Sequence, residues 1–270
     1  MEPWLILLPA FVMSALMILT HTYLGLHVLA RGIIFVDLAL AQMAALGMSL
    51  AFMLGEEPHG LNAQLYAFGA TLVTAIAFAG LRHLPGKTTR EIIIGCVYVV
   101  ATALSVVILS RSSQGMEELS TLFNGNILWI RWQEIAVVAM IYLALAMLHG
   151  IYHKQFYTLS FSTEEARSRS PGFLWEFLFF ASFAIVITIA VNVAGVLLVF
   201  AFLIIPAFSA SLVVHSFIAR LLLGWCLGLL GAIAGLCLSF SADLPVGATV
   251  VSVLGLLPLI AAALGACSRS

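Results

Sequence analysis

Long apolar runs separated by short polar islands are the dominant pattern along this chain. A helix needs about 20 apolar residues to cross a hydrocarbon core about 30 Å thick, so most of the runs fit one crossing each. The pattern therefore predicts a polytopic bundle of transmembrane α-helices. The runs without Asp, Glu, Lys or Arg include residues 3–30, 38–55, 61–81, 92–110, 135–153, 177–219, 221–242 and 244–268.

Residues 177–219 form the one run that is too long for a single crossing, because it holds 43 residues. A polar break at Asn192 to Gly195 divides it, so we expect about nine spans, with eight as the alternative. Closed barrels alternate polar and apolar positions, which the uniformly apolar residues 196–206 do not. The fold class is thus all-α, and we expect residues 1–270 to form a single transmembrane domain.

The composition agrees with a membrane protein. Charged residues make up 9% of the chain and hydrophobic residues 63%, whereas a soluble domain of this size needs a charged surface. Lys and Arg are retained on the cytoplasmic side of a membrane. If the loop at 82–91 lies inside and the spans alternate, nine of the 11 basic residues fall inside. They are Arg31, Arg82, Lys87, Arg90, Lys154, Arg167, Arg169, Arg220 and Arg269.

This partition places the amino terminus outside and the carboxyl terminus in the cytoplasm, as an odd span count requires. We interpret the first apolar run as a retained span rather than a signal peptide, because no basic flank precedes it. The expected location is the bacterial plasma or inner membrane, with several passes through the lipid.

Two polar islands on the expected cytoplasmic side are large enough to dock a partner. The second of them, residues 153–176, contains a helix-start pattern of a capping Thr followed by acids. It predicts a short helix at Thr163, Glu164, Glu165, Ala166 and Arg167.

In the first island, residues 82–91, Gly86-Lys87-Thr88 imitates the end of a phosphate-binding loop. The full pattern needs a Gly where Leu81 stands, so the chain carries no nucleotide site of its own.

Ionisable and polar groups inside the membrane are costly and are functional candidates by default. At 1.5 Å per residue, His21, Gln42 and Tyr98 lie roughly 12, 13 and 10 Å from the expected inner ends of their helices. His27 and Asp37 lie nearer the cytoplasm. These five side chains are our candidates for a polar pathway, and His21, His27 and Asp37 are the candidate metal ligands. The simpler alternatives are hydrogen bonding within the bundle and, for Asp37, a pair with Arg31.

Two further features concern helix packing. Gly224, Gly228, Gly231 and Gly235 form a face of small residues that allows close approach of backbones within the bundle or across a dimer. Pro206 removes a backbone donor and predicts a kink. Kinked helices in transporters often border the transport pathway.

Four segments resemble the membrane subunit of bacterial ABC importers for zinc, manganese and iron. They lie in the same order as in that family and are spread along nearly the whole chain. The third is the most specific, with a Gly-x-Leu-Leu run that ends in Leu-Ile-Ile-Pro-Ala. The segments are residues 31–47, 121–134, 194–211 and 243–251.

The resemblance implies a homodimeric permease with no enzymatic activity of its own. Cytoplasmic ABC ATPase subunits would hydrolyse ATP, and an extracytoplasmic metal-binding protein would deliver the ion. The segment at 163–167 then corresponds to the helix that couples to the ATPase. The cargo would be a divalent zinc, manganese or iron ion, with no permanently bound cofactor and no nucleic-acid partner.

The second helix departs from the family's usual pattern of an Asp and a His four residues apart. Aligned on Gly47, Gln42 stands in place of the His and Leu38 in place of the Asp. Asp37 is one position early and faces about 100° away on an ideal helix. Either a rearranged set such as His21, His27 and Asp37 contacts the metal, or the cargo differs.

Two other functions are the alternatives. A secondary transporter working alone is disfavoured by the large inner islands and by the lack of recognisable internal repeats. An intramembrane hydrolase would need paired Asp, Ser/His or His-Glu-x-x-His motifs, which the sequence lacks. The identity of the metal, the span count and the helices of the dimer interface stay open at this point.

Overall fold

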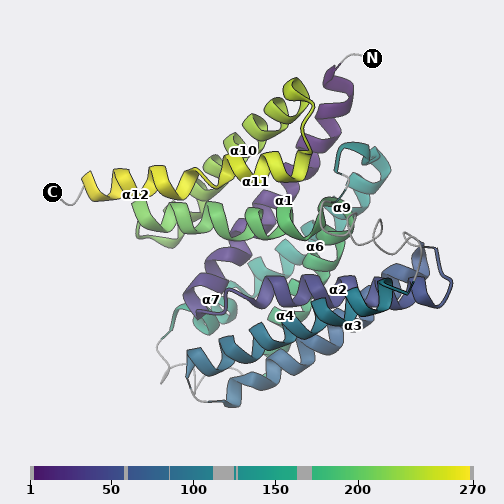
Figure 1. Ribbon diagram of the computed structural model, residues 1–270. Coiled ribbons are helices and arrows are strands. Elements are labelled where there is room, and N and C mark those ends of the chain that lie inside the picture. The colour runs from purple at the N-terminus through teal and green to yellow at the C-terminus, as the bar shows by residue number, and fades with distance from the viewer. Residues whose placement is uncertain are drawn as a thin grey trace. The chain divides into compact units, whose positions relative to one another are not determined.

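The computed structural model describes residues 3–57, 60–84, 86–111, 125, 127–162 and 172–267, and this part of the chain is helical without strands (Figure 1). The all-α prediction is therefore confirmed. The α-helices are α1 (Pro3–Arg31), α2 (Val36–Met53), α3 (Leu61–Gly80), α4 (Lys87–Leu109), α6 (Trp132–Ile151), α7 (His153–Phe161), α9 (Phe173–Val213), α10 (Phe217–Ala242), α11 (Val246–Leu254) and α12 (Leu257–Cys267). Two short 3-10 helices are η1 (Leu81–His83) and η2 (Ile127–Trp129).

Eight helical segments of the described chain are long and apolar enough to cross a membrane. Each coincides with an apolar run of the sequence, and α11 with the start of α12 forms the last. The count of eight is the lower of the two expected values, because the 177–219 run lies in one 41-residue helix, α9. An even count places both termini on one side, so it does not support the expected orientation, which stays a prediction.

Helix α9 is interrupted where the sequence predicts a break. Gly195 has φ 74° and ψ 162°, which are outside the helical range and in a region that favours glycine. The segments 173–194 and 196–213 on either side are about 33 and 27 Å long at 1.5 Å per residue. The backbone leaves the helical range at Gly195 and not at Pro206.

The chain forms two compact units, each built from separate stretches of sequence. Unit 1 comprises Met1–Leu29, Asn124–Ala144 and Val193–Ser270. Unit 2 comprises Ala30–Phe123 and Leu145–Asn192. The boundary at residues 192 and 193 falls beside the interruption of α9, so the two parts of this helix belong to different units.

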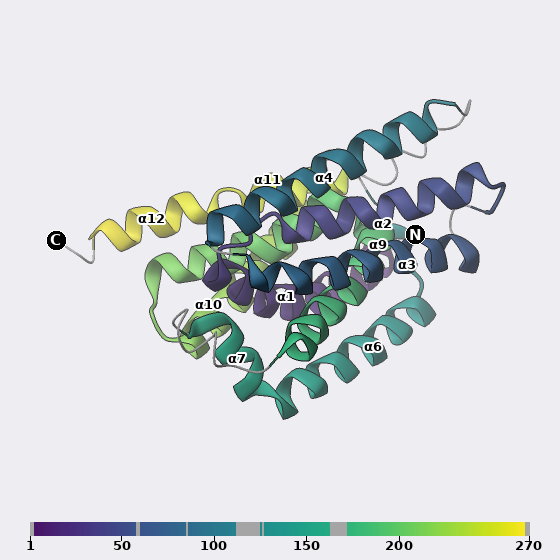
Figure 2. The same ribbon diagram turned by 90° about the horizontal axis from the view of Figure 1, so that it is seen from below.

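In unit 2, α2 packs against both α3 and α4, and the three helices run side by side in both views (Figures 1 and 2). Helix α2 is the most enclosed of the three, with most of its residues buried. Gly47 lies against α3 so closely that a Cβ would be 2.5 Å from the Tyr66 carbonyl oxygen and 2.6 Å from the Ala67 Cα. Such backbone-to-backbone approach is how helices associate where lipid offers no hydrophobic driving force.

In unit 1, the predicted small-residue face of α10 is used within the chain. A Cβ at Gly224 or Gly228 would meet Thr22 or Ile18 of α1 at 2.7 Å, and both positions also touch Pro206. A Cβ at Gly235 would meet the Val250 Cα at 2.6 Å, on the neighbouring α11 (Figure 1). From the sequence, this face could pack within the bundle or across a dimer. The structure shows packing within the chain.

Replacing Gly47 with Ala tests the close approach of α2 and α3. The new methyl group has to push back backbone atoms, and overpacking of this kind costs about 1–3 kcal/mol of unfolding free energy. Gly69→Ala on α3 is the matched control, because nothing lies within 4 Å of its Cβ position. We expect the unfolding temperature in detergent to fall for Gly47→Ala only; equal values for both variants would contradict the packing described.

Candidate functional site

Asp37 lies in the first turn of α2, where the positive end of the helix dipole favours an anionic side chain. Its side chain is fully buried, with 0% of its surface exposed. Neither carboxylate oxygen accepts a hydrogen bond from any residue that the structure describes. A buried carboxylate normally has a partner, because an unpaired one loses its hydration without compensation. Asp37 is therefore the chain's most conspicuous candidate for contact with a cation.

The simpler interpretation, a pair of Asp37 with Arg31, is not what the structure shows. Arg31 instead forms an ion pair with Glu176 at the start of α9, and both side chains are buried. The Arg31 guanidinium also lies over the rings of Phe179 and Phe180, 4.6 and 4.9 Å from their centroids. The cation expected to neutralise Asp37 is thus already engaged elsewhere in unit 2.

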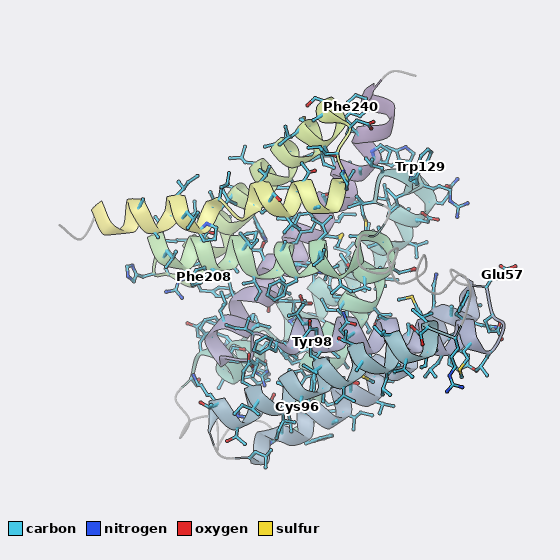
Figure 3. All side chains as sticks on the ribbon, in the orientation of Figure 1. Glu57, Cys96, Tyr98, Trp129, Phe208 and Phe240 are labelled. Atoms are coloured by element: carbon cyan, nitrogen blue, oxygen red, sulfur yellow. The ribbon has the colours of Figure 1, made fainter. Side chains whose placement is uncertain are left out.

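The other candidates in unit 2 differ in their surroundings. Gln42 is buried, and its amide nitrogen has no partner among the described residues. It lies five positions after Asp37, about 140° around an ideal helix, so the two side chains do not share a face of α2. Tyr98 is half-buried on α4, two residues beyond the exposed Cys96 (Figure 3).

His21 of unit 1 is fully buried on α1 and is held in a defined orientation. Its Nδ1 lies 2.8 Å from the Met17 carbonyl oxygen, which can only accept, so Nδ1 carries the hydrogen of this bond. In the neutral ring, Nε2 then presents a lone pair, and this atom has no partner among the described residues. Metal-binding histidines are oriented in the same manner, by a hydrogen bond from the second ring nitrogen.

His27 is also buried, but it packs among aromatic rings. Its centroid lies 4.7 Å from that of Tyr23 and 5.7 Å from that of Phe217, both in unit 1. These contacts favour a structural role for His27 over coordination. Of the two histidines on α1, His21 is thus the better candidate for a ligand.

The interruption of α9 is a third feature of interest in unit 1. A Cβ on Gly125 would overlap the backbone of Ala194 and Gly195, so Gly125, two residues before η2, lies directly against the break. Helix η2 in turn contacts α11. Two of the four segments that carry the family resemblance, 194–211 and 243–251, and most of a third, 121–134, therefore belong to unit 1, whereas the segment 31–47 lies in unit 2.

The candidate residues are divided between the units. Asp37, Gln42 and Tyr98 belong to unit 2, and His21, His27 and Pro206 to unit 1. Within the described ranges, no three His, Cys, Asp or Glu side chains are grouped so that they could hold a metal ion. The expected coupling segment at Thr163–Arg167 lies outside the described residues.

Sequence reasoning missed several buried polar side chains. Thr22, beside His21, has a buried hydroxyl without a partner among the described residues. His149 of α6 lies 2.8 Å from the Ser182 hydroxyl and stacks on Phe156. Glu176 ends the polar island 153–176 in the sequence, where nothing in the pattern signals a partner 145 residues away. Adjacency to His21 is the only sequence signal that marks Thr22.

Comparison with known proteins agrees with the segments above. The model of the ABC 3 transport family matches residues 4–265. The "Probable metal transport system membrane protein" of Chlamydia pneumoniae is 24% identical over 258 residues, which cover 94% of this chain and 87% of that protein. The manganese transport system membrane protein MntC of Listeria innocua is 26% identical over 240 residues, covering 88% of this chain and 83% of its own.

A solved structure shows the same fold. The chain is similar to PsaBC from Streptococcus pneumoniae, solved in complex with Fab, with a TM-score of 0.75 and 21% sequence identity. The match covers 95% of this chain and 90% of that one.

The two buried acids respond differently to neutralisation if Asp37 has no structural partner. Glu176→Gln leaves the Arg31 charge unpaired and should lower the unfolding free energy by about 3–5 kcal/mol. Asp37→Asn replaces a buried carboxyl group that has no hydrogen bond to the described residues, so stability should stay equal or rise.

Glu134→Gln is the control, because it breaks the exposed pair with Arg131 and should change the unfolding free energy by at most about 1 kcal/mol. The measurement is thermal unfolding of the three variants in one detergent. A loss for Asp37→Asn as large as that for Glu176→Gln would assign Asp37 a structural role instead.

Proposed function

The chain belongs to the ABC 3 transport family, and on this premise we propose that it is the membrane permease of an ATP-driven importer for a divalent transition metal ion. Zinc, manganese and iron are the candidate cargoes. The single observation that carries the proposal within the chain is the buried and unpartnered carboxylate of Asp37. A cation passing this position would supply the compensation that the protein does not.

A transport pathway needs weak contacts, since an ion held by a complete ligand set would not leave. Single ligands that come from different helices are consistent with this requirement. Asp37 offers oxygen, His21 offers an imidazole nitrogen with a free lone pair, and Gln42 and Tyr98 add neutral polar groups. Imidazole and carboxylate together suit zinc, manganese and iron, whereas no thiolate pair favours copper.

The proposed assembly contains a second copy of this chain, cytoplasmic ABC ATPase subunits and an extracytoplasmic metal-binding protein. ATP hydrolysis belongs to the ATPase, and the segment Thr163–Arg167 is the proposed contact with it. The family of the chain and its likeness to the membrane proteins named above support this arrangement. The stripe of glycines on α10 is occupied within unit 1, so the interface between copies lies on other residues.

Uptake by starved cells tests both the cargo and Asp37. Cells lacking this chain should lose one of zinc, manganese or iron selectively, measured as whole-cell metal content. Asp37→Asn should leave cells at the level of the deletion. Ser49→Ala on the same helix should transport normally, because the buried Ser49 hydroxyl donates its hydrogen bond to the Ala45 carbonyl oxygen of its own helix.

Two results would contradict this proposal. If no metal changes in the deletion strain, the cargo is of another kind and only the architecture of the family applies. If Asp37→Asn, expressed at the normal level, transports like Ser49→Ala, the pathway does not use Asp37.

Purification of the tagged chain from its own membranes tests the partners. We expect an ABC ATPase subunit to co-purify, with metal-binding protein stimulating its ATP hydrolysis in nanodiscs. Cross-linking before solubilisation should give a band at twice the mass of the chain. Metal transport by the purified chain alone in vesicles, without ATP, would favour a secondary transporter.

A further inference from the structure

One face of α4 lies along the turn that connects α1 to α2. Lys87, Glu91 and Gly95 follow one another at four-residue intervals, so they share a face of this helix. The Lys87 Nζ lies 3.5 Å from the Ala30 carbonyl oxygen. A Cβ on Gly95 would lie 3.9 Å from the Phe35 ring. These contacts all belong to unit 2, so α4 holds the turn at both of its ends.

Glu91, the middle residue of this face, bonds to the start of α2. Its Oε1 accepts a hydrogen bond from the Phe35 backbone N–H at 2.9 Å. Phe35 is the N-cap residue of α2, and its own side chain forms no capping bond. In a capping box, a Glu three residues after the N-cap would accept from this amide, but that position is Leu38. A carboxylate from a neighbouring helix therefore supplies the bond that the sequence of α2 lacks.

Asp37 lies two residues after the amide that Glu91 holds. No described residue donates a hydrogen bond to the Asp37 carboxylate, so the direction of this side chain depends on the backbone of the first turn. The Arg31–Glu176 pair anchors the other end of the connection, but Gly32, with a φ of 66°, lies in between. Glycine leaves the backbone free to adopt several conformations. The bond from Glu91 is thus the anchor on the Asp37 side of that glycine.

We propose that Glu91 is a positioning residue for Asp37, which it aims at the transported cation by holding the first turn of α2. A hydrogen bond to a charged acceptor is among the stronger bonds available for this purpose. The inference rests on the proposed function, in which the Asp37 carboxylate contacts the ion. Glu91 would act through the backbone, without touching the metal.

Direct contact of Glu91 with the ion is the competing role. Glu91 is half-buried, and its Oε2 has no partner among the described residues. The two roles make different demands on the side chain. Positioning needs only an acceptor at Oε1, which Gln retains, whereas contact with a metal ion needs the negative charge, which Gln lacks.

Hydrogen–deuterium exchange tests the bond itself, with the full-length chain in nanodiscs. Glu91→Ala removes the acceptor, so peptides that contain Phe35 should exchange about tenfold faster, as expected for the loss of one hydrogen bond. Glu91→Gln should exchange nearly as slowly as the wild type. Glu57→Ala is the matched control, because this acid is exposed beyond the other end of α2 (Figure 3).

Metal uptake by starved cells tests the positioning. At normal expression, Glu91→Ala should lower the uptake rate about tenfold, in proportion to the loss of the bond. Glu91→Gln should restore most of the rate, and Glu57→Ala should transport normally. Asp37→Asn, measured alongside, gives the rate that remains without a carboxylate at this position.

Four results would overturn the proposal, each for a different reason. Unchanged exchange in Glu91→Ala would mean that the bond does not hold the turn. Fast exchange with normal uptake in that variant would leave the bond a structural role only. A Glu91→Gln variant with normal exchange that transports as poorly as Asp37→Asn would make Glu91 a direct contact. Normal uptake in Asp37→Asn would be a failure of the proposed function, and the role of Glu91 would fall with it although the exchange result would stand.

Discussion

The cost of taking charge out of water is the constraint on which the rest of this molecule depends. Where the chain buries a charge for structural reasons, it supplies a partner of opposite charge. Arg31 and Glu176 pair with each other at the ends of α1 and α9, and aromatic rings cover the guanidinium. The pair joins residues that are 145 positions apart and so holds together the two separate stretches that make up unit 2.

Asp37 is buried like Arg31 and Glu176, but it has no partner of opposite charge among the described residues. Asp37 lies only six residues from Arg31, close enough that a pair between them is the obvious structural solution. The structure gives Arg31 to Glu176 instead and leaves the Asp37 carboxylate without a donor among the described residues. We propose that Asp37 is retained for function and that a loss of stability is the cost of that function.

The fold could be predicted largely from sequence, because its main determinant is local. Uninterrupted apolar runs fix where helices cross, and the polar residues before Gly195 marked the one break inside a long run. What could not be predicted depends on contacts between distant segments. The Arg31–Glu176 pair, the close approach of Gly125 to α9 and the division into two units each need residues far apart in the chain. The sequence left the span count between eight and nine for a related reason, since a 43-residue run is compatible with one interrupted helix or with two.

Contacts that the sequence does not reveal also decide which candidate residues can act as ligands. The residue types were visible from sequence, but their value as ligands is decided by their second contacts. His21 and His27 look equivalent on α1, six residues apart. Yet the Met17 carbonyl fixes His21 so that Nε2 is available, while His27 is enclosed by the rings of Tyr23 and Phe217. On the family resemblance, Gln42 stands where a His is expected on α2. We therefore propose the His21 imidazole on α1 and the Asp37 carboxylate at the start of α2 as separate metal contacts, one in each unit.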